Sequence, residues 1–190
     1  MARLILASAS PRRKELLEQL GISDFVVRPA PAEIEPEGLP PGETVQATAL
    51  AKGQAVAEMA APGELVLAAD TEVYFEGKLL GKPKDEADAM AMLRRLSGAK
   101  HTVYTGIALI LDGVVRTDVE VTDVYFRTLT EEEIRAYVAT GEPMDKAGAY
   151  GIQGRAAHFV RRIEGDVYNV IGLPLCLLTE RAREMGVCLF

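Results

Sequence analysis

The sequence predicts an α/β fold with a mixed, curved sheet flanked by helices and divided into two lobes around a central cleft. Short apolar runs alternate with helical patterns at both ends of the 190-residue chain. In the middle, two long stretches rich in Val, Tyr, Thr and Ile meet at Asp112-Gly113, and an Asp-Gly pair between such stretches is a strong hairpin signal. We expect one domain that covers residues 1–190.

The N-terminal part is predicted to alternate strands and helices. Ser10 is a good N-cap and Pro11 suits the first position of a helix. Pro62-Gly63 stops the second helix, and the apolar run that follows suits a central strand buried on both faces, ending abruptly at Asp70. The predicted elements are a strand over residues 4–6, a helix over 11–20, a strand over 25–28, a proline-rich loop through Pro41, a helix from the cap Thr44 to about Met59, and a strand over 65–69.

The middle of the chain is predicted to contain two hairpins. Glu76-Gly77 forms the first turn, between Tyr74-Phe75 and Lys78-Leu79. A helix from about Asp85 to Leu96 follows, and Ser97-Gly98 ends it. The second hairpin runs from His101 to Phe126.

The C-terminal part is predicted to begin with a helix from about Thr130 to Ala139. Thr130 and Glu133 have the spacing of a capping box. The glycine-rich stretch 145–154 then precedes a strand over 157–163 and a final helix that begins near Leu173-Pro174.

Composition narrows the class of function. The chain has 21 Lys+Arg against 28 Asp+Glu, a net charge of -7, so a broad nucleic-acid or anionic-membrane surface is not expected. The apolar runs are far shorter than a membrane span, and the charged residues after Arg13 argue against a signal peptide. Two cysteines indicate neither a disulfide framework nor a zinc site. We expect a protein of the reducing cytoplasm.

The segment Leu4–Lys14 predicts an anion pocket. It joins a short buried strand to a helix start with hydroxyls and three consecutive cations. Unpaired amides, the positive end of the helix dipole and the guanidiniums of Arg12 and Arg13 would converge on a phosphate or carboxylate. A solvated charge run is the alternative. However, cations in a first helical turn cost stability unless an anion binds, so we favour the pocket and a small anionic ligand.

The carboxylates suit metal-assisted phosphoryl chemistry. The chain has no Walker A loop, HExxH, GxSxG or GxGxxG motif, and two histidines supply too little for a histidine-based triad or metal cage. Asp70, at the end of a buried strand, could ligate Mg²⁺ or Mn²⁺ or accept a proton from water, or could simply form a turn. Glu33 is either a metal ligand or a solvated side chain. Lys82, between Gly81 and Pro83, either reaches a phosphate or is a surface lysine.

Residues 145–154, DKAGAYGIQG, are unusual for a plain loop. Small residues permit close approach of a ligand, and they alternate with Asp145, Lys146, Tyr150 and Gln153. An amide is both donor and acceptor, so Gln153 can read the O4 and N3–H edge of uracil or thymine. The alternative is a glycine-rich connection between strands.

These motifs resemble the Maf family of nucleotide pyrophosphatases, in order and over nearly the whole chain. The matching segments are residues 6–16, LASASPRRKEL, residues 69–71, ADT, residues 81–83, GKP, residues 96–98, LSG, and residues 145–154. The last segment is similar to that of the branch acting on dTTP and UTP. The resemblance implies an α/β fold similar to that of inosine triphosphate pyrophosphatases, and hydrolysis of a nucleoside triphosphate between its α and β phosphates with a divalent cation, Mg²⁺ or Mn²⁺.

The resemblance also assigns roles to residues. Asp70 matches the proton acceptor that activates water, and it would ligate the metal together with Glu33. The positions credited with substrate choice are Arg12, Thr71 and Gln153, and those that contact phosphate are Ser8, Arg13 and Lys82. One departure is that relatives usually have a lysine where this chain has Gln54. Lys52 lies on a different face of that helix but could supply the contact instead.

Two other classes of function compete with the enzyme. A nucleotide-binding regulator of septum formation, a role associated with the family, would bind nucleotide without turnover. The water-activating carboxylate Asp70 beside Arg12 and Lys82 argues for catalysis. A nucleic-acid-binding protein ranks last because of the acidic charge. An open edge strand could also pair two copies, so a homodimer is an expectation.

Overall fold

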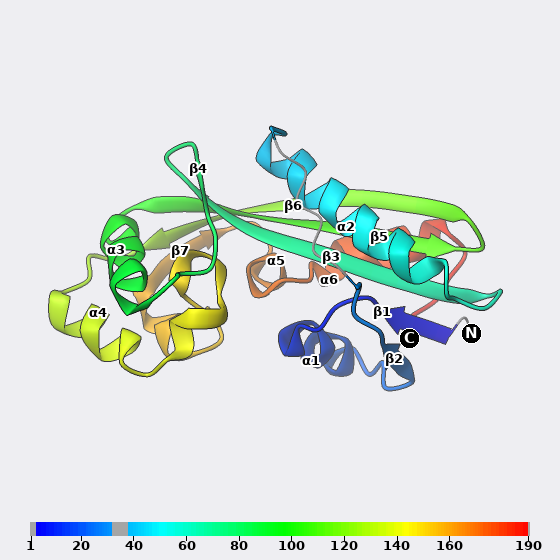
Figure 1. The fold of residues 1–190 in the computed structure, drawn as a ribbon, viewed down its shortest axis with the longest axis horizontal. Coiled ribbons are helices and arrows are strands. Elements are labelled where there is room, and N and C mark those ends of the chain that lie inside the picture. Colours follow the sequence, from blue (N-terminus) through cyan, green and yellow to red (C-terminus); the bar gives the residue numbers. More distant parts are fainter. Residues whose placement is uncertain (1–2, 32–37, 190) are drawn as a thin grey trace. The chain divides into compact units, whose positions relative to one another are not determined.

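The computed structural model describes residues 3–31 and 38–189, and it contains strands, helices and short 3-10 helices in mixed order (Figure 1). Glu33 lies outside the described residues. The elements are β1 Arg3–Leu6, α1 Pro11–Gln19, β2 Phe25–Val27, α2 Pro41–Ala57, β3 Glu64–Phe75, β4 Lys78–Leu80, α3 Glu86–Leu96, β5 Lys100–Leu111, β6 Val114–Phe126, α4 Glu131–Val138, the 3-10 helices η1 Glu142–Asp145, η2 Ala147–Ala149 and η3 Arg155–Phe159, β7 Val160–Glu164, α5 Val167–Ile171 and α6 Leu175–Glu184.

The strands form a seven-stranded mixed sheet in the order β2-β1-β3-β5-β6-β7, with β4 paired to β3. β1 is parallel to both β2 and β3, whereas the β3–β4 and β6–β7 pairs are antiparallel. Parallel pairs need a crossover connection, which α1 and α2 provide, and antiparallel pairs can follow one another through tight turns. The predicted mixed α/β class is therefore confirmed.

The chain divides into two compact units. Unit 1 comprises Met1–Asp70, Thr105–Glu120 and Gly172–Phe190, and unit 2 comprises Thr71–Tyr104 and Val121–Ile171. Because the boundaries fall within β3, β5 and β6, each of these strands contributes residues to both units. The predicted cleft and the single domain over residues 1–190 stay predictions.

In unit 1, α2 packs directly on the strands. Its buried side chains Ala49 and Val56 join a core with residues of β1, β3 and β5. Gly106 allows the helix to come close, since a Cβ there would lie 2.4 Å from the carbonyl oxygen of Val45. Figure 1 shows α2 lying along these strands.

In unit 2, the core is rich in aromatic rings. Phe126 of β6 meets Tyr150 with ring centroids 4.8 Å apart, and Tyr137 of α4 meets Phe159 at 5.2 Å, both edge to face. Such pairs stabilise a core beyond the area that they bury. The buried side chains of α3 and α4 complete this core.

Several local predictions are confirmed. Asp112 and Gly113 have φ values of 49° and 81° at the β5–β6 turn, and Glu76 and Gly77 have 50° and 73° at the β3–β4 turn. Positive φ at both central residues is the geometry that favours Asp-Gly in two-residue hairpins. Thr130 and Glu133 form the predicted capping box of α4.

The strand predicted to end at Asp70 continues to Phe75, so that boundary is wrong. The change at Asp70 is from a continuously buried run to a stretch of half-buried and buried residues, not from strand to loop. Pairing of residues 73–75 with β4 extends the strand. Asp70 therefore lies inside β3 and does not form a turn.

Two further boundaries and one short helix differ from the predictions. α2 begins at Pro41, and Thr44 is in its first turn, where its hydroxyl donates to the carbonyls of Leu39 and Pro40 and does not cap. β7 begins at Val160, because residues 155–159 form η3. The short helix α5 was not predicted, since five residues give too little periodicity.

Candidate functional site

The start of α1 brings Ser8 and Arg13 together. Ser10 occupies the N-cap position, but its side chain makes no capping bond; its N–H donates to Ser8 Oγ at 3.2 Å. Arg13 Nη1 donates to the same Oγ at 2.9 Å, and Arg13 Nε donates to the carbonyl oxygen of Gly172 at 2.8 Å. The two predicted phosphate contacts are thus one hydrogen-bonded pair.

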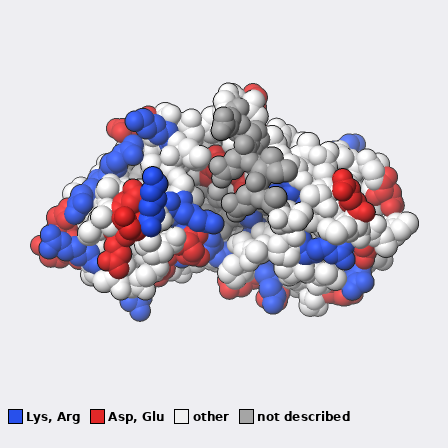
Figure 2. Space-filling model, in the orientation of Figure 1, with Lys and Arg blue, Asp and Glu red and all other residues white. Residues whose placement is uncertain are grey.

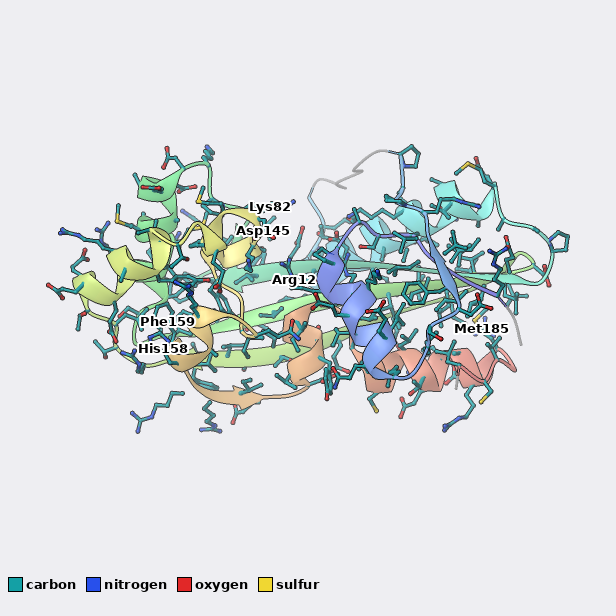
Figure 3. The ribbon with its side chains drawn as sticks, turned by 90° about the horizontal axis from the view of Figure 1, so that it is seen from below. Arg12, Lys82, Asp145, His158, Phe159 and Met185 are labelled. Carbon is teal, nitrogen blue, oxygen red and sulfur yellow. The ribbon has the colours of Figure 1, made fainter. Side chains whose placement is uncertain are left out.

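The pKa of Arg13 is shifted by burial and by two neighbouring charges, those of Asp70 and Arg12. Its pKa is lowered to about 10, chiefly by burial; the negative charge of Asp70 opposes the shift, and the positive charge of Arg12 adds to it. Arg13 therefore keeps its charge at neutral pH. Arg12 is half-buried at the start of α1 (Figure 3). The predicted anion pocket accordingly gathers cations near one carboxylate.

Asp70 pairs with Lys52 of α2. Lys52 Nζ lies 2.7 Å from Asp70 Oδ1, and both side chains are 16% exposed. Lys52 thus places a cation beside Asp70, whereas Gln54 on the same helix is exposed, and a phosphate contact of Lys52 stays a prediction. Thr71 follows Asp70 in β3 and is half-buried.

In unit 2, Lys82 follows the β3–β4 hairpin and is exposed. The backbone beside it is tied to the glycine-rich segment, since Gly148 N–H donates to the carbonyl oxygen of Gly81 at 3.1 Å. Gly148 has a φ of 69° and lies against Val73. Figure 3 labels Lys82 and Asp145 on these neighbouring loops.

The glycine-rich segment is folded against the core of unit 2. Tyr150 is buried, and its hydroxyl is 2.8 Å from Nε2 of buried His101. Burial lowers the pKa of His101 to about 4, so its ring is neutral at pH 7. Gln153, three residues after Tyr150, is exposed. The amide predicted to read a base is therefore presented from a fixed backbone.

Few described side chains are placed to ligate a divalent cation near Asp70. Among residues 3–31 and 38–189, no three His, Cys, Asp or Glu side chains are grouped to hold a metal ion. Mg²⁺ commonly uses one or two carboxylates and completes its shell with water and substrate phosphates. With Oδ1 on Lys52, Asp70 still offers Oδ2 as such a ligand.

The surface charge is mixed. On the face in Figure 2, lysine and arginine side chains are interspersed with acidic ones over the described residues. This pattern agrees with the acidic net charge of the chain. No helix in the described part of the chain is long and apolar enough to cross a membrane.

The predicted site residues thus fall into two groups in the structure, one in each unit. Ser8, Arg13 and Asp70 lie together in unit 1 with Lys52, whose ion pair with the Asp70 carboxylate the sequence did not predict. Lys82 and the segment 145–154 lie together in unit 2. Sequence reasoning missed Tyr137 and Glu142, which contact that segment; the only available signal was their closeness to it along the chain.

Comparisons with known proteins identify relatives that match nearly the whole chain. Residues 3–185 match the family model described as Maf-like protein. A "dTTP/UTP pyrophosphatase" of Geobacillus sp. (strain WCH70) is 50% identical over 186 residues, covering 98% of this chain and 100% of the relative. A "dTTP/UTP pyrophosphatase" of Moorella thermoacetica is 52% identical over 193 residues, covering 98% of this chain and 97% of the relative.

Among solved structures, a dITP/XTP pyrophosphatase from Mycobacterium abscessus is similar with a TM-score of 0.42 and 16% identity, over 73% of this chain and 95% of that one. The family model, by contrast, spans the start of α1, Asp70 and the glycine-rich segment in one match. The full-length identities near one half extend the match over the same residues. This chain therefore belongs to the Maf family.

Proposed function

We propose that this protein hydrolyses dTTP and UTP to the nucleoside monophosphate and pyrophosphate. The observation that carries the proposal is the Asp70 carboxylate, held by Lys52 at 2.7 Å and close enough to Arg13 to raise its pKa. A carboxylate among cations suits activation of water beside a polyphosphate. Relatives of about half-identical sequence and nearly equal length are named dTTP/UTP pyrophosphatase, which supports this substrate class.

In this proposal, Asp70 orients a water and takes its proton as the oxygen attacks the α-phosphorus. The bond between that phosphorus and the α–β bridging oxygen breaks, and pyrophosphate leaves with the electron pair. Ser8, Arg13 and Lys82 bind phosphate oxygens and stabilise their charge, which is the main contribution a protein makes to phosphoryl transfer. Lys52 holds the carboxylate in place before substrate binds.

Substrate choice is assigned to Arg12, Thr71 and Gln153. The exposed Gln153 amide can donate to O4 and accept from N3–H, a pattern shared by uracil and thymine. Cytosine has an amino group and an unprotonated N3 at the same positions, so it presents the opposite pattern. Held in this orientation, the same side chain would accept dTTP and UTP and discriminate against dCTP, since only the reversed orientation of the amide matches cytosine.

A bound Mg²⁺ or Mn²⁺ would neutralise phosphate charge and polarise the reacting phosphate. Asp70 Oδ2 is the ligand that the described residues offer, and Glu33, outside them, is the second proposed ligand. The ion pair with Lys52 holds the Asp70 carboxylate in place for this role.

The proposal is tested by measuring pyrophosphate release from a panel of nucleoside triphosphates with Mg²⁺ or Mn²⁺. Asp70→Asn should lower turnover of dTTP by at least ~100-fold, the scale of a lost general base. Asp118→Asn is the matched control, because Asp118 is a charge-paired carboxylate of the same unit, 2.7 Å from Arg181, and has no proposed role. Nucleotide binding without turnover by the wild type would instead indicate a regulator.

A further inference from the structure

The backbone on both sides of Gln153 is held by side chains outside the glycine-rich segment. Gly151 N–H donates to Tyr137 Oη at 3.3 Å, and the Tyr137 hydroxyl lies 3.1 Å from Glu142 Oε1. Arg155 N–H donates to the Glu142 carboxylate, at 3.0 and 3.1 Å from its two oxygens. These bonds close a ring around residues 151–155, with Gln153 at its centre.

The protonation state of Tyr137 suits this ring. The side chain is 4% exposed and packs edge to face on Phe159. Burial raises its pKa, and the nearby Glu142 charge raises it further. The hydroxyl therefore keeps its proton, so it can donate to Glu142 while it accepts from Gly151. One side chain thus links two otherwise separate anchors.

The segment is also closely packed on these groups. A Cβ added to Gly154 would lie 2.0 Å from Glu142 Oε1, and one added to Gly151 would lie 2.7 Å from Lys146 Cε. Lys146 Nζ in turn donates to the backbone carbonyl of Glu142 at 2.6 Å. The glycines allow the backbone to approach the carboxylate, which fixes the path of the chain through Gln153.

We propose that Glu142, together with Tyr137, is a positioning residue that sets the base selectivity of Gln153. The inference rests on the proposed function, in which Gln153 reads the base. An amide discriminates between bases only if its donor and acceptor are held in register with the base edge. Because the Gln153 side chain is exposed, that register depends on the backbone at residues 151–155.

The kinetic test compares kcat/KM for dTTP and dCTP. Glu142→Ala should lower the ratio of the two values by ~10-fold, because a lost charged hydrogen bond is worth about one such factor. The loss should occur through a higher KM for dTTP, and Glu142→Gln, which keeps an acceptor, should restore most of it. In a Gln153→Ala background, Glu142→Ala should have no further effect on the ratio. Glu132→Ala, at an exposed glutamate of α4, is the control.

Two results would overturn the proposal. One is an equal loss for both nucleotides, since that indicates a general structural role. The other is a loss of selectivity in the Gln153→Ala background as large as in the wild type, since the two residues would then act independently. If Glu142→Ala does not fold, Tyr137→Phe decides the question, because it removes only the hydroxyl that joins Gly151 to Glu142.

A separate measurement needs no turnover. Amide hydrogen exchange of the nucleotide-free protein should show that Glu142→Ala speeds exchange of the Arg155 and Gly151 amides by ~10-fold, whereas Glu132→Ala does not. If Glu142→Ala speeds exchange but the wild type does not hydrolyse dTTP, the proposed function is refuted. The hydrogen-bonded ring around residues 151–155 is then still supported. If the wild type hydrolyses dTTP but Glu142→Ala leaves the exchange rates unchanged, the positioning role of Glu142 is refuted. The proposed function is then still supported.

Discussion

The two units hold their candidate functional side chains by different means. In unit 1, charge dominates: Lys52 pairs with Asp70, and Arg13 keeps its charge although burial lowers its pKa to about 10. In unit 2, the neutral pair His101–Tyr150 holds the segment that carries Gln153. The difference matches two tasks, since phosphates require compensating charge and a base edge requires a fixed pattern of donors and acceptors. Changes at Lys52 or Asp70 in unit 1 should therefore affect turnover, and changes around His101 and Gln153 in unit 2 should affect stability and selectivity.

The largest expected effect is the pH dependence of stability in unit 2. The folded-state pKa of His101 is about 4 because of burial, against 6.5 for an unfolded chain; the Asp123 charge opposes the shift, and the other polar partner at the ring is the Tyr150 hydroxyl. The unfolded chain therefore takes up a proton that the folded chain does not. Stability should fall as pH drops from about 6.5 to 4, by about 3 kcal/mol at pH 4 relative to pH 7.

Urea unfolding at pH 7 and pH 4 measures this effect. His101→Gln should reduce the loss of stability between pH 7 and pH 4 by about 3 kcal/mol. His158→Gln, at an exposed histidine of the same unit, should leave that loss unchanged. An identical pH dependence in the wild type and His101→Gln would mean that the buried pair does not contribute, and the contrast between neutral and charged units would fail.

The next effect tests the role of charge in unit 1. Lys52→Met should lower kcat/KM for dTTP by ~100-fold, because it removes the cation that holds Asp70 and leaves that carboxylate alone among the phosphates. Gln54→Met, at an exposed position of the same helix, is the matched control. Steady-state pyrophosphate release gives the result. Full activity of Lys52→Met would show that the ion pair holds nothing that the reaction needs.

The site in unit 1 also shows how far the sequence could lead. The segment around α1 combined a strand, an N-terminal helical turn and adjacent arginines, so Ser8 and Arg13 could be placed together from local pattern alone. The contact between Lys52 and Asp70 joins α2 to β3. No local rule gives that distance, because it depends on how closely α2 packs on the strands, which Gly106 permits.

The fold was predictable where local signals were strong. The turns at Asp112-Gly113 and Glu76-Gly77 and the capping box of Thr130 follow from backbone chemistry within a few residues. The end of β3 was not predictable, because Asp70 looks like a terminator, whereas pairing with β4 continues the strand. The ring through Tyr137 and Glu142 was equally hidden, since it joins α4 and η1 to a loop through backbone amides.

A smaller effect tests base reading in unit 2. Gln153→Ala should lower the ratio of kcat/KM for dTTP to that for dCTP by ~10-fold, as expected for the loss of one hydrogen-bonded contact. The affinity for the metal should change much less, because the Gln153 amide is not among the proposed metal ligands, Asp70 and Glu33. Gln54→Ala is the control. A uniform loss across all bases would contradict a role in base reading.

The smallest effect separates stability of unit 2 from selectivity. Thr130→Ala removes the hydroxyl that accepts from Glu133 N–H at 3.2 Å at the start of α4, and it should cost about 1 kcal/mol of stability. The ratio of dTTP to dCTP hydrolysis should not change, because Gly151 and Arg155 bind Tyr137 and Glu142, which lie beyond that first turn. Thermal unfolding and the two kcat/KM values, with Thr128→Ala as control, give the answer. A fall in selectivity that parallels the fall in stability would mean that base selection depends on the whole of unit 2 and not on the ring around Gln153.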